Sequence, residues 1–203
     1  CKDGSVILSD PVVPLGYTFN GWYDANNNKI TELPLGNTTV KADFTLLYKD
    51  LPKLNYTVNS DGKTITVTGV NDKNITSIEI PDIATSIGPS AFADCTSLTS
   101  ITIPFVGATK DGTSNTHFGY IFGASSYTYN DAYVPESLKT VIITGGTSIG
   151  NEAFYDCRSL TSVDIPDSVT TIGNYAFYYC TSLTSIDIPD GVTTIGLAAF
   201  SGC

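Results

Sequence analysis

The chain has 203 residues, of which 41% are hydrophobic, so it is long and apolar enough to bury a core. The 10 Lys and Arg residues and the 20 Asp and Glu residues give a net charge of -10. No basic stripe is therefore expected for nucleic acid or an anionic lipid surface, and no apolar run approaches the roughly 18 residues that a membrane-spanning helix needs.

The two ends of the chain do not look like the ends of a gene product. The sequence contains no Met, begins at Cys1 and ends at Cys203. We expect a piece of a longer protein whose export or anchoring signals lie outside it. Cys1 could carry the lipid of a mature lipoprotein, or it could mark a boundary chosen for expression.

Residues 1–49 share no period with the rest of the chain and predict a small β-rich domain, with a polar turn at 26–29 and a strand at 40–46. The stretch 16–23, Gly-Tyr-Thr-Phe-Asn-Gly-Trp-Tyr, resembles the core motif of the Listeria-Bacteroides repeat, a β-grasp-like module of bacterial surface proteins. Trp22 and Tyr23 could stack on a sugar, but we favour a core role for a single Trp in so small a domain.

Residues 50–74 are predicted to form a linker and a capping hairpin. The stretch 56–67 contains two alternating segments around a turn at Asp61 and Gly62. Such a hairpin would cover the apolar edge of the first coil of the repeats that follow. No equivalent cap follows Cys203 in this sequence, so we expect further repeats or another molecule to cover the last coil.

Residues 75–203 are built on a period of 23 residues. The segment 162–180 recurs at 185–203 with the same Ile-Pro-Asp, Val-Thr-Thr-Ile-Gly, Ala-Phe and Cys elements. Earlier copies begin at residues 77 and 141, and a further strand-like stretch lies at 100–104. A fixed period of this kind predicts a solenoid, here of five coils.

Each copy is predicted to contain a short strand, a turn and a short helical return. Leu183, Ile186 and Ile188 should point inward. Ser185 and Asp187 lie between them and should point outward, which is the period of two that marks a strand. The Ile-Gly-x-x-Ala-Phe stretch spaces its apolar residues as one turn of helix does. Stacked coils then form a parallel sheet on the concave face.

The repeated pattern I-x-I-P-D-x-V-T-x-I-G-x-x-A-F-x-x-C-x-S-L-T resembles the BspA-like leucine-rich repeat of bacterial surface proteins. The resemblance implies an α/β leucine-rich-repeat solenoid. It also implies a cell-surface or secreted module for adhesion, with host extracellular matrix or other cells as partners.

Four cysteines share one repeat position and predict a ladder of small, buried, reduced thiols: Cys95, Cys157, Cys180 and Cys203. Disulfides fit less well, because parallel side chains on stacked coils rarely meet the required dihedral angle. Zinc fits least, because no Cys-x-x-Cys pair and no second His accompany them.

The second coil contains an insertion. Pro81 and Leu98 are 17 residues apart, whereas their counterparts Pro104 and Leu138 are 34 apart. The extra residues lie at about 105–136. Insertions in solenoids map to loops on one face, and these loops often bind a partner.

The insertion is rich in aromatic residues. The stretch 117–122 is predicted to replace the usual return, with Phe118, Ile121 and Phe122 turned inward. The remaining tyrosines, Tyr127, Tyr129 and Tyr133, are candidates for contacting a protein or a glycan. Alternatively, they simply cover the widened coil.

The outward strand face is the second candidate surface, formed by Ser162, Asp164, Ser185 and Asp187, with Glu79 on an earlier coil. Asp164 and Asp187 occupy equivalent places on adjacent coils, so they repel each other unless water or a cation lies between them. A solvated acidic face and a calcium site are both compatible with this pattern.

No catalytic motif accompanies these surfaces. The single His117 has no nucleophile motif beside it, and the chain contains no phosphate-binding loop and no His-Glu-x-x-His zinc motif. We therefore predict a non-catalytic binding module without a cofactor or metal. The alternatives are a passive spacer that projects another domain, or an accessory region of a larger secreted enzyme.

Overall fold

The computed structural model describes residues 6–33 and 39–203, and the chain divides into two compact units, Cys1–Lys49 and Asp50–Cys203. Cys1, for which lipidation was one expectation, lies outside the described residues.

The first unit consists of short antiparallel strands. Strand β2 lies between β3 and β5, and β1 pairs with β4. The half-buried Trp22 packs against Phe19, with 5.7 Å between ring centroids, and its Nε1 donates to the Ser9 carbonyl over 3.0 Å. These contacts fit a core role for Trp22. The strands are β1 (Val6–Ile7), β2 (Tyr17–Tyr23), β3 (Lys29–Ile30), β4 (Glu32–Leu33) and β5 (Lys41–Leu46).

The second unit opens with the predicted hairpin. After a 3-10 turn, η1 (Leu51–Lys53), strand β6 (Leu54–Val58) pairs antiparallel with β7 (Ile65–Val70). Asp61 closes the turn, because its Oδ1 accepts the amides of Lys63 and Thr64 over 2.9 Å each. Strand β7 then pairs in parallel with β9 (Ala84–Ile87), so the hairpin caps the solenoid through backbone hydrogen bonds.

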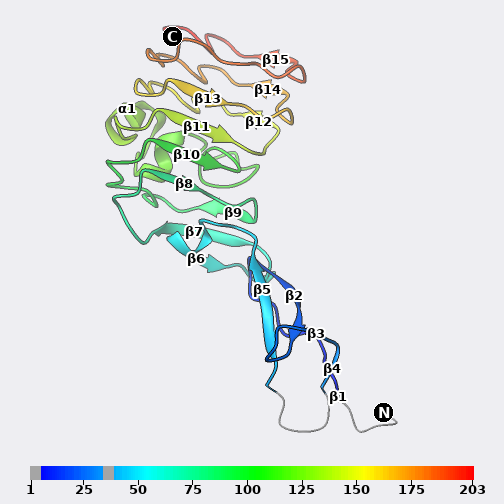
Figure 1. Ribbon diagram of the computed structural model, residues 1–203. Helices are drawn as coiled ribbons and strands as arrows, with labels where there is room; N and C mark the ends of the chain where they lie inside the picture. The colour runs from blue at the N-terminus through cyan, green and yellow to red at the C-terminus, as the bar shows by residue number, and fades with distance from the viewer. Residues whose placement is uncertain (1–5, 34–38) are drawn as a thin grey trace. The chain divides into compact units, whose positions relative to one another are not determined.

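The coils stack through two parallel sheets, one on each side of the solenoid (Figure 1). The first has the order β13-β11-β10-β8, and Ile78, Ile101, Val141 and Val163 lie in register as its buried central row. Its strands are β8 (Ser77–Glu79), β10 (Ser100–Ile103), β11 (Thr140–Ile143) and β13 (Ser162–Asp164). The second contains β12 (Ser148–Ile149), β14 (Thr171–Ile172) and β15 (Thr194–Ile195).

The predicted helical returns are turns in the structure. The amide of Phe154 donates to the Ala176 carbonyl on the next coil over 2.7 Å, and the amide of Phe177 donates to Ala199 over 2.7 Å. These amides are therefore not available for helical hydrogen bonds. Residues in the left-handed region, such as Glu152 (φ 50°), reverse the chain between successive turns.

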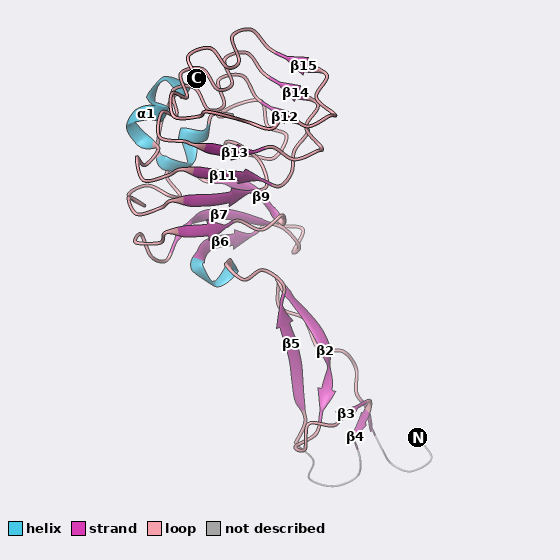
Figure 2. Ribbon diagram, turned by 45° about the horizontal axis from the view of Figure 1, so that its top comes forward, coloured by secondary structure: helices cyan, strands magenta, loops and turns pink. Residues whose placement is uncertain are grey.

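Among residues 6–33 and 39–203, helical turns occur at η1 and in the insertion, where they gather on one side of the coil stack (Figure 2). They are η2 (Phe118–Phe122), η3 (Tyr127–Tyr129) and α1 (Asn130–Tyr133).

A ladder of phenylalanine rings runs through the core. Phe118 and Phe154 have ring centroids 5.0 Å apart, Phe154 and Phe177 are stacked at 5.1 Å, and Phe177 and Phe200 at 5.2 Å. Because each ring contacts its counterpart one coil away, the aromatic position of the repeat joins neighbouring coils.

The repeat cysteines are unpaired, and Cys95, Cys157 and Cys180 are buried as predicted, whereas Cys203 is exposed. Burial raises the pKa of the Cys157 thiol well above its usual value and that of Cys180 to about 12. The buried thiols therefore stay protonated, which makes them poor nucleophiles and poor metal ligands.

The last coil departs from the prediction. Residues 183–189 form no strand, Ile186 is only half-buried, and Ile188 is 37% exposed. The physical reason is that this coil packs against a neighbour on one side only, so its apolar side chains are not covered from both sides.

Candidate binding surfaces

The structure brings the predicted strand-face residues together. Ser162 and Asp164 on β13, with Ser185 and Asp187 on the next coil, line one surface hollow of about 240 Å³. Both carboxylates are exposed. This arrangement offers hydroxyl and carboxylate oxygens side by side to a polar partner.

Glu79 does not join this hollow. In the sheet register, Asp164 lies opposite Ile142 and Glu79 lies opposite Thr102, so two strands with uncharged residues separate the carboxylates. Within the described residues, no group of three or more His, Cys, Asp or Glu side chains is placed to hold a metal ion.

The insertion separates its aromatic residues into two sets. Phe118, Ile121 and Phe122 are buried, as predicted from their spacing. By contrast, Tyr127, Tyr129 and Tyr133 are 36%, 52% and 48% exposed. These three tyrosines are therefore free to make contacts with another molecule.

A buried amide fixes the tyrosine loop in place. Asn130 is fully buried, its Oδ1 accepts the Gly119 amide over 3.0 Å, and its Nδ2 donates to the Tyr155 carbonyl over 2.9 Å. His117 Nδ1 lies 3.3 Å from the same Oδ1. Asn130 thus joins the insertion to the return of the following coil. Sequence reasoning missed it, because the residue has no counterpart in the repeat.

His117 is also part of this buried network. Burial lowers the pKa of His117, and the hydrogen bond to Asn130 opposes that shift in part. The ring meets Tyr120 edge-on at a centroid distance of 6.2 Å. These neighbours indicate a structural role for His117 in its neutral form.

The exposed tyrosines continue into an aromatic row that sequence reasoning also missed. Tyr127 packs edge-on against Tyr155 at a centroid distance of 5.2 Å, and Tyr155 stacks on Tyr178 at 5.1 Å. Tyr178 in turn meets Tyr179 at 4.6 Å. A signal was present in the sequence, since Tyr155 and Tyr178 share one repeat position directly after the core Phe.

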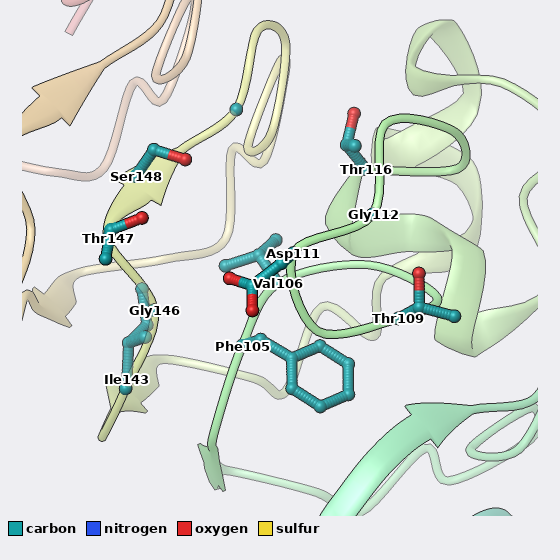
Figure 3. A pocket seen from close by; sticks show the side chains of 12 residues that line it. Phe105, Val106, Thr109, Asp111, Gly112, Thr116, Ile143, Gly146, Thr147 and Ser148 are labelled. Carbon is teal, nitrogen blue, oxygen red and sulfur yellow. The ribbon is translucent and has the colours of Figure 1, made fainter.

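A second hollow lies between the loop 105–116 and β12 (Figure 3). The Asp111 carboxylate points into it, toward Gly146 and Thr147. Its volume of about 60 Å³ holds only a few water molecules. This hollow is therefore too small to take a sugar ring or a large side chain.

A larger groove of about 570 Å³ lies on the other side of the insertion, against the return of the first coil. It contains both apolar and acidic side chains from the two segments, among them Phe122, Tyr133, Asp94 and Asp131.

In the described part of the chain, no helix is both long and apolar enough to cross a membrane.

Comparison with protein families identifies the repeat family. The model of the BspA type leucine-rich repeat region matches residues 63–113 and 126–203 with 6 copies. This is one copy more than the five coils predicted from the period. The first matched stretch begins inside the capping hairpin, where β7 pairs with β9 as the strands of later coils pair with each other.

Several solved structures are similar. A leucine-rich repeat protein from T. pallidum is 20% identical over 77% of this chain and 67% of its own, with a TM-score of 0.43. A leucine-rich cell surface protein from Faecalibacterium prausnitzii is 29% identical over 77% of this chain and 52% of its own, with a TM-score of 0.41. A leucine-rich repeat protein from Bacteroides ovatus is 30% identical over 64% of this chain and 35% of its own, with a TM-score of 0.42.

The chain thus spans about half of the second protein and about a third of the last. A comparison with curated proteins gives no match. Because the family model matches more than half of its residues, the chain belongs to the family of BspA-type leucine-rich repeat proteins.

Proposed function

We propose that this chain is a non-catalytic protein-interaction module of a bacterial cell-surface or secreted protein. The observation that carries the proposal is the exposure of Tyr127, Tyr129 and Tyr133 on an insertion anchored by the buried Asn130. Tyrosines held on an ordered segment supply a large contact area, and little conformational entropy is lost when they bind.

Adhesion to host extracellular matrix or to other cells is the proposed biological role, with a protein or a glycan as the ligand. The description of the F. prausnitzii protein as a cell surface protein supports this location. The motif at 16–23 supports it further, because we propose that residues 1–49 are a Listeria-Bacteroides-type repeat of the kind found on bacterial surfaces.

The strand-face hollow is the second proposed contact surface. Its oxygen-rich lining of Ser162, Asp164, Ser185 and Asp187 suits a polar partner. In a stacked solenoid, adjacent coils present such side chains in a regular row, so a long ligand could contact several coils.

The proposal is tested by measuring binding of the 203-residue protein to a panel of immobilised matrix proteins and glycans. The variant Y127A/Y129A/Y133A removes the exposed rings, and Y127F/Y129F/Y133F is the matched control that keeps them. We expect the alanine variant to bind at least about tenfold more weakly, which corresponds to about 1.4 kcal/mol. The Phe variant should retain most of the affinity.

Two outcomes would contradict the proposal. If the alanine variant binds as well as the wild type, the tyrosines do not form the contact surface. The variant S162A/D164N/S185A/D187N then tests the strand face. If no member of the panel binds any version of the protein, the passive spacer becomes the better explanation.

A further inference from the structure

The groove beside the insertion opens where one of the regular backbone hydrogen bonds between neighbouring returns is missing. In later coils, three backbone amides of each return donate to the next coil. Between the third and fourth returns these hydrogen bonds run from Glu152 to Asn174 (2.9 Å), from Phe154 to Ala176 (2.7 Å) and from Asp156 to Tyr178 (2.6 Å).

The first return makes only two of these three hydrogen bonds. The Ser90 amide donates to Tyr120 over 3.2 Å, and the Phe92 amide donates to Ile121 over 2.9 Å. The third amide, that of Asp94, makes no hydrogen bond to any described residue. The reason is that the chain leaves the coil at Gly123, which has a φ of 111°, so no carbonyl lies where the third acceptor would be.

On the side that faces the following coil, the insertion does replace the missing backbone hydrogen bond. There, the Asn130 side chain donates to the Tyr155 carbonyl and replaces the backbone amide that a regular return would supply. On the side of the first return, no described residue replaces the acceptor for the Asp94 amide, and the groove of about 570 Å³ opens at this place.

The groove combines apolar walls with an acidic rim. Its apolar lining includes Phe122, Tyr133, Val134 and Pro135, and its carboxylates are Asp94, Asp131 and Glu136. The 48% exposure of Tyr133 leaves much of its ring open to a bound group.

The three carboxylates are available for a cation from outside. Among the described residues, none of them forms an ion pair within 4.0 Å, and no Lys, Arg or His lines the groove. Lys139 Nζ, the nearest lysine amine to Glu136 in sequence, donates to the Glu136 carbonyl over 2.7 Å. Arg158 forms its ion pair with Asp156 and acts on Asp131 only through its charge, without an ion pair within 4.0 Å.

We propose that this groove binds a peptide segment of a partner protein through a Lys or Arg side chain. A carbonyl of the segment accepts the Asp94 amide and completes the missing hydrogen bond. The aliphatic stem of the basic side chain packs on Tyr133 and Pro135, and its charged end lies among the carboxylates. This inference rests on the proposed interaction function and adds the chemistry of the partner.

The test is a titration of the isotope-labelled 203-residue protein with a hexalysine peptide, followed by two-dimensional NMR of the backbone amides. We expect the amides of Asp94, Asp131 and Tyr133 to shift first and most. The peptide with all six side chains acetylated keeps the carbonyls but has no charge, and it should bind at least about tenfold more weakly.

The variant D94N/D131N/E136Q tests the groove directly, and D82N/D167N/D190N is its matched control. The control removes three exposed carboxylates from the repeated Pro-Asp position, so both variants change the net charge equally. We expect about a tenfold or greater loss of hexalysine affinity in the groove variant and little change in the control.

Equal losses in both variants would overturn the proposal, because they would show attraction to the overall negative charge. Shifts centred away from the groove, or no binding of hexalysine, would overturn it as well. Its failure is distinguishable from that of the proposed function. If a matrix partner binds through Tyr127 and Tyr129 but is insensitive to the groove variant, the module stands and the groove has another role.

Discussion

Replacing Asn130 with Ala should lower the free energy of unfolding of the solenoid far more than the loss of an exposed amide side chain would. The change removes the acceptor for the Gly119 amide and the donor to the Tyr155 carbonyl, which lie 3.0 Å and 2.9 Å from the Asn130 side chain. Leaving a buried backbone group without a partner costs about 1–3 kcal/mol. Because the Tyr155 bond is only partly buried, we expect a total loss of about 2–4 kcal/mol.

Asn174→Ala is the matched control. The Oδ1 of Asn174 accepts the Leu197 amide over 2.7 Å, but this hydrogen bond is exposed. Water can replace the side chain there, so the expected loss is about 0.5–1 kcal/mol. The two variants therefore delete the same chemical group from a buried and an exposed place in the same unit.

Urea denaturation followed by far-UV circular dichroism measures both losses. The fluorescence of Trp22, the single Trp of the chain, reports on the first unit and serves as an internal reference. Hydrogen exchange should also become faster at Tyr127, Tyr129 and Tyr133 in the Asn130→Ala variant. A loss below about 0.5 kcal/mol, or one no larger than that of Asn174→Ala, would refute the role assigned to Asn130.

Three further outcomes follow from the core. Burial lowers the pKa of His117 below its usual 6.5, so the folded state resists protonation. The free energy of unfolding should therefore fall as the pH drops from 6.5 through the lower pKa of the folded state, and His117→Phe should remove this pH dependence. In the native protein, Cys203 should react with a thiol reagent faster than Cys180, which reacts only on unfolding, and equal rates would contradict their different burial. Phe154→Ala should cost about 3–5 kcal/mol in urea denaturation, because its ring contacts both Phe118 and Phe177; a loss under about 1 kcal/mol would contradict the ladder.

The solenoid and its hairpin cap could be predicted because their signals are local and periodic. The alternation around Ile78 and its counterparts predicts strands, and the turn at Asp61 predicts the hairpin. The prediction of helical returns was wrong. The spacing of the apolar residues fits a helix, but the structure has turns there. The amides of Phe154 and Phe177 instead find acceptors one coil away, and such contacts are not encoded in local spacing.

The candidate surfaces were only partly predictable for a similar reason. The break in the repeat spacing and the aromatic content of the insertion singled out Tyr127, Tyr129 and Tyr133, which the structure leaves exposed. The role of Asn130 and the unpaired amide of Asp94 depend on hydrogen bonds that the insertion breaks and replaces. Because the insertion occurs once, the repeat period gives no information about which of its residues take over those contacts.

The most direct measurement is the affinity of the 203-residue protein for the matrix protein or glycan that binds it best, determined for the wild type, Y127A/Y129A/Y133A and Y127F/Y129F/Y133F. We predict that the alanine variant loses at least about tenfold in affinity while the Phe variant stays close to the wild type. Equal affinities for all three proteins would contradict a function in which the ordered aromatic insertion makes the contact.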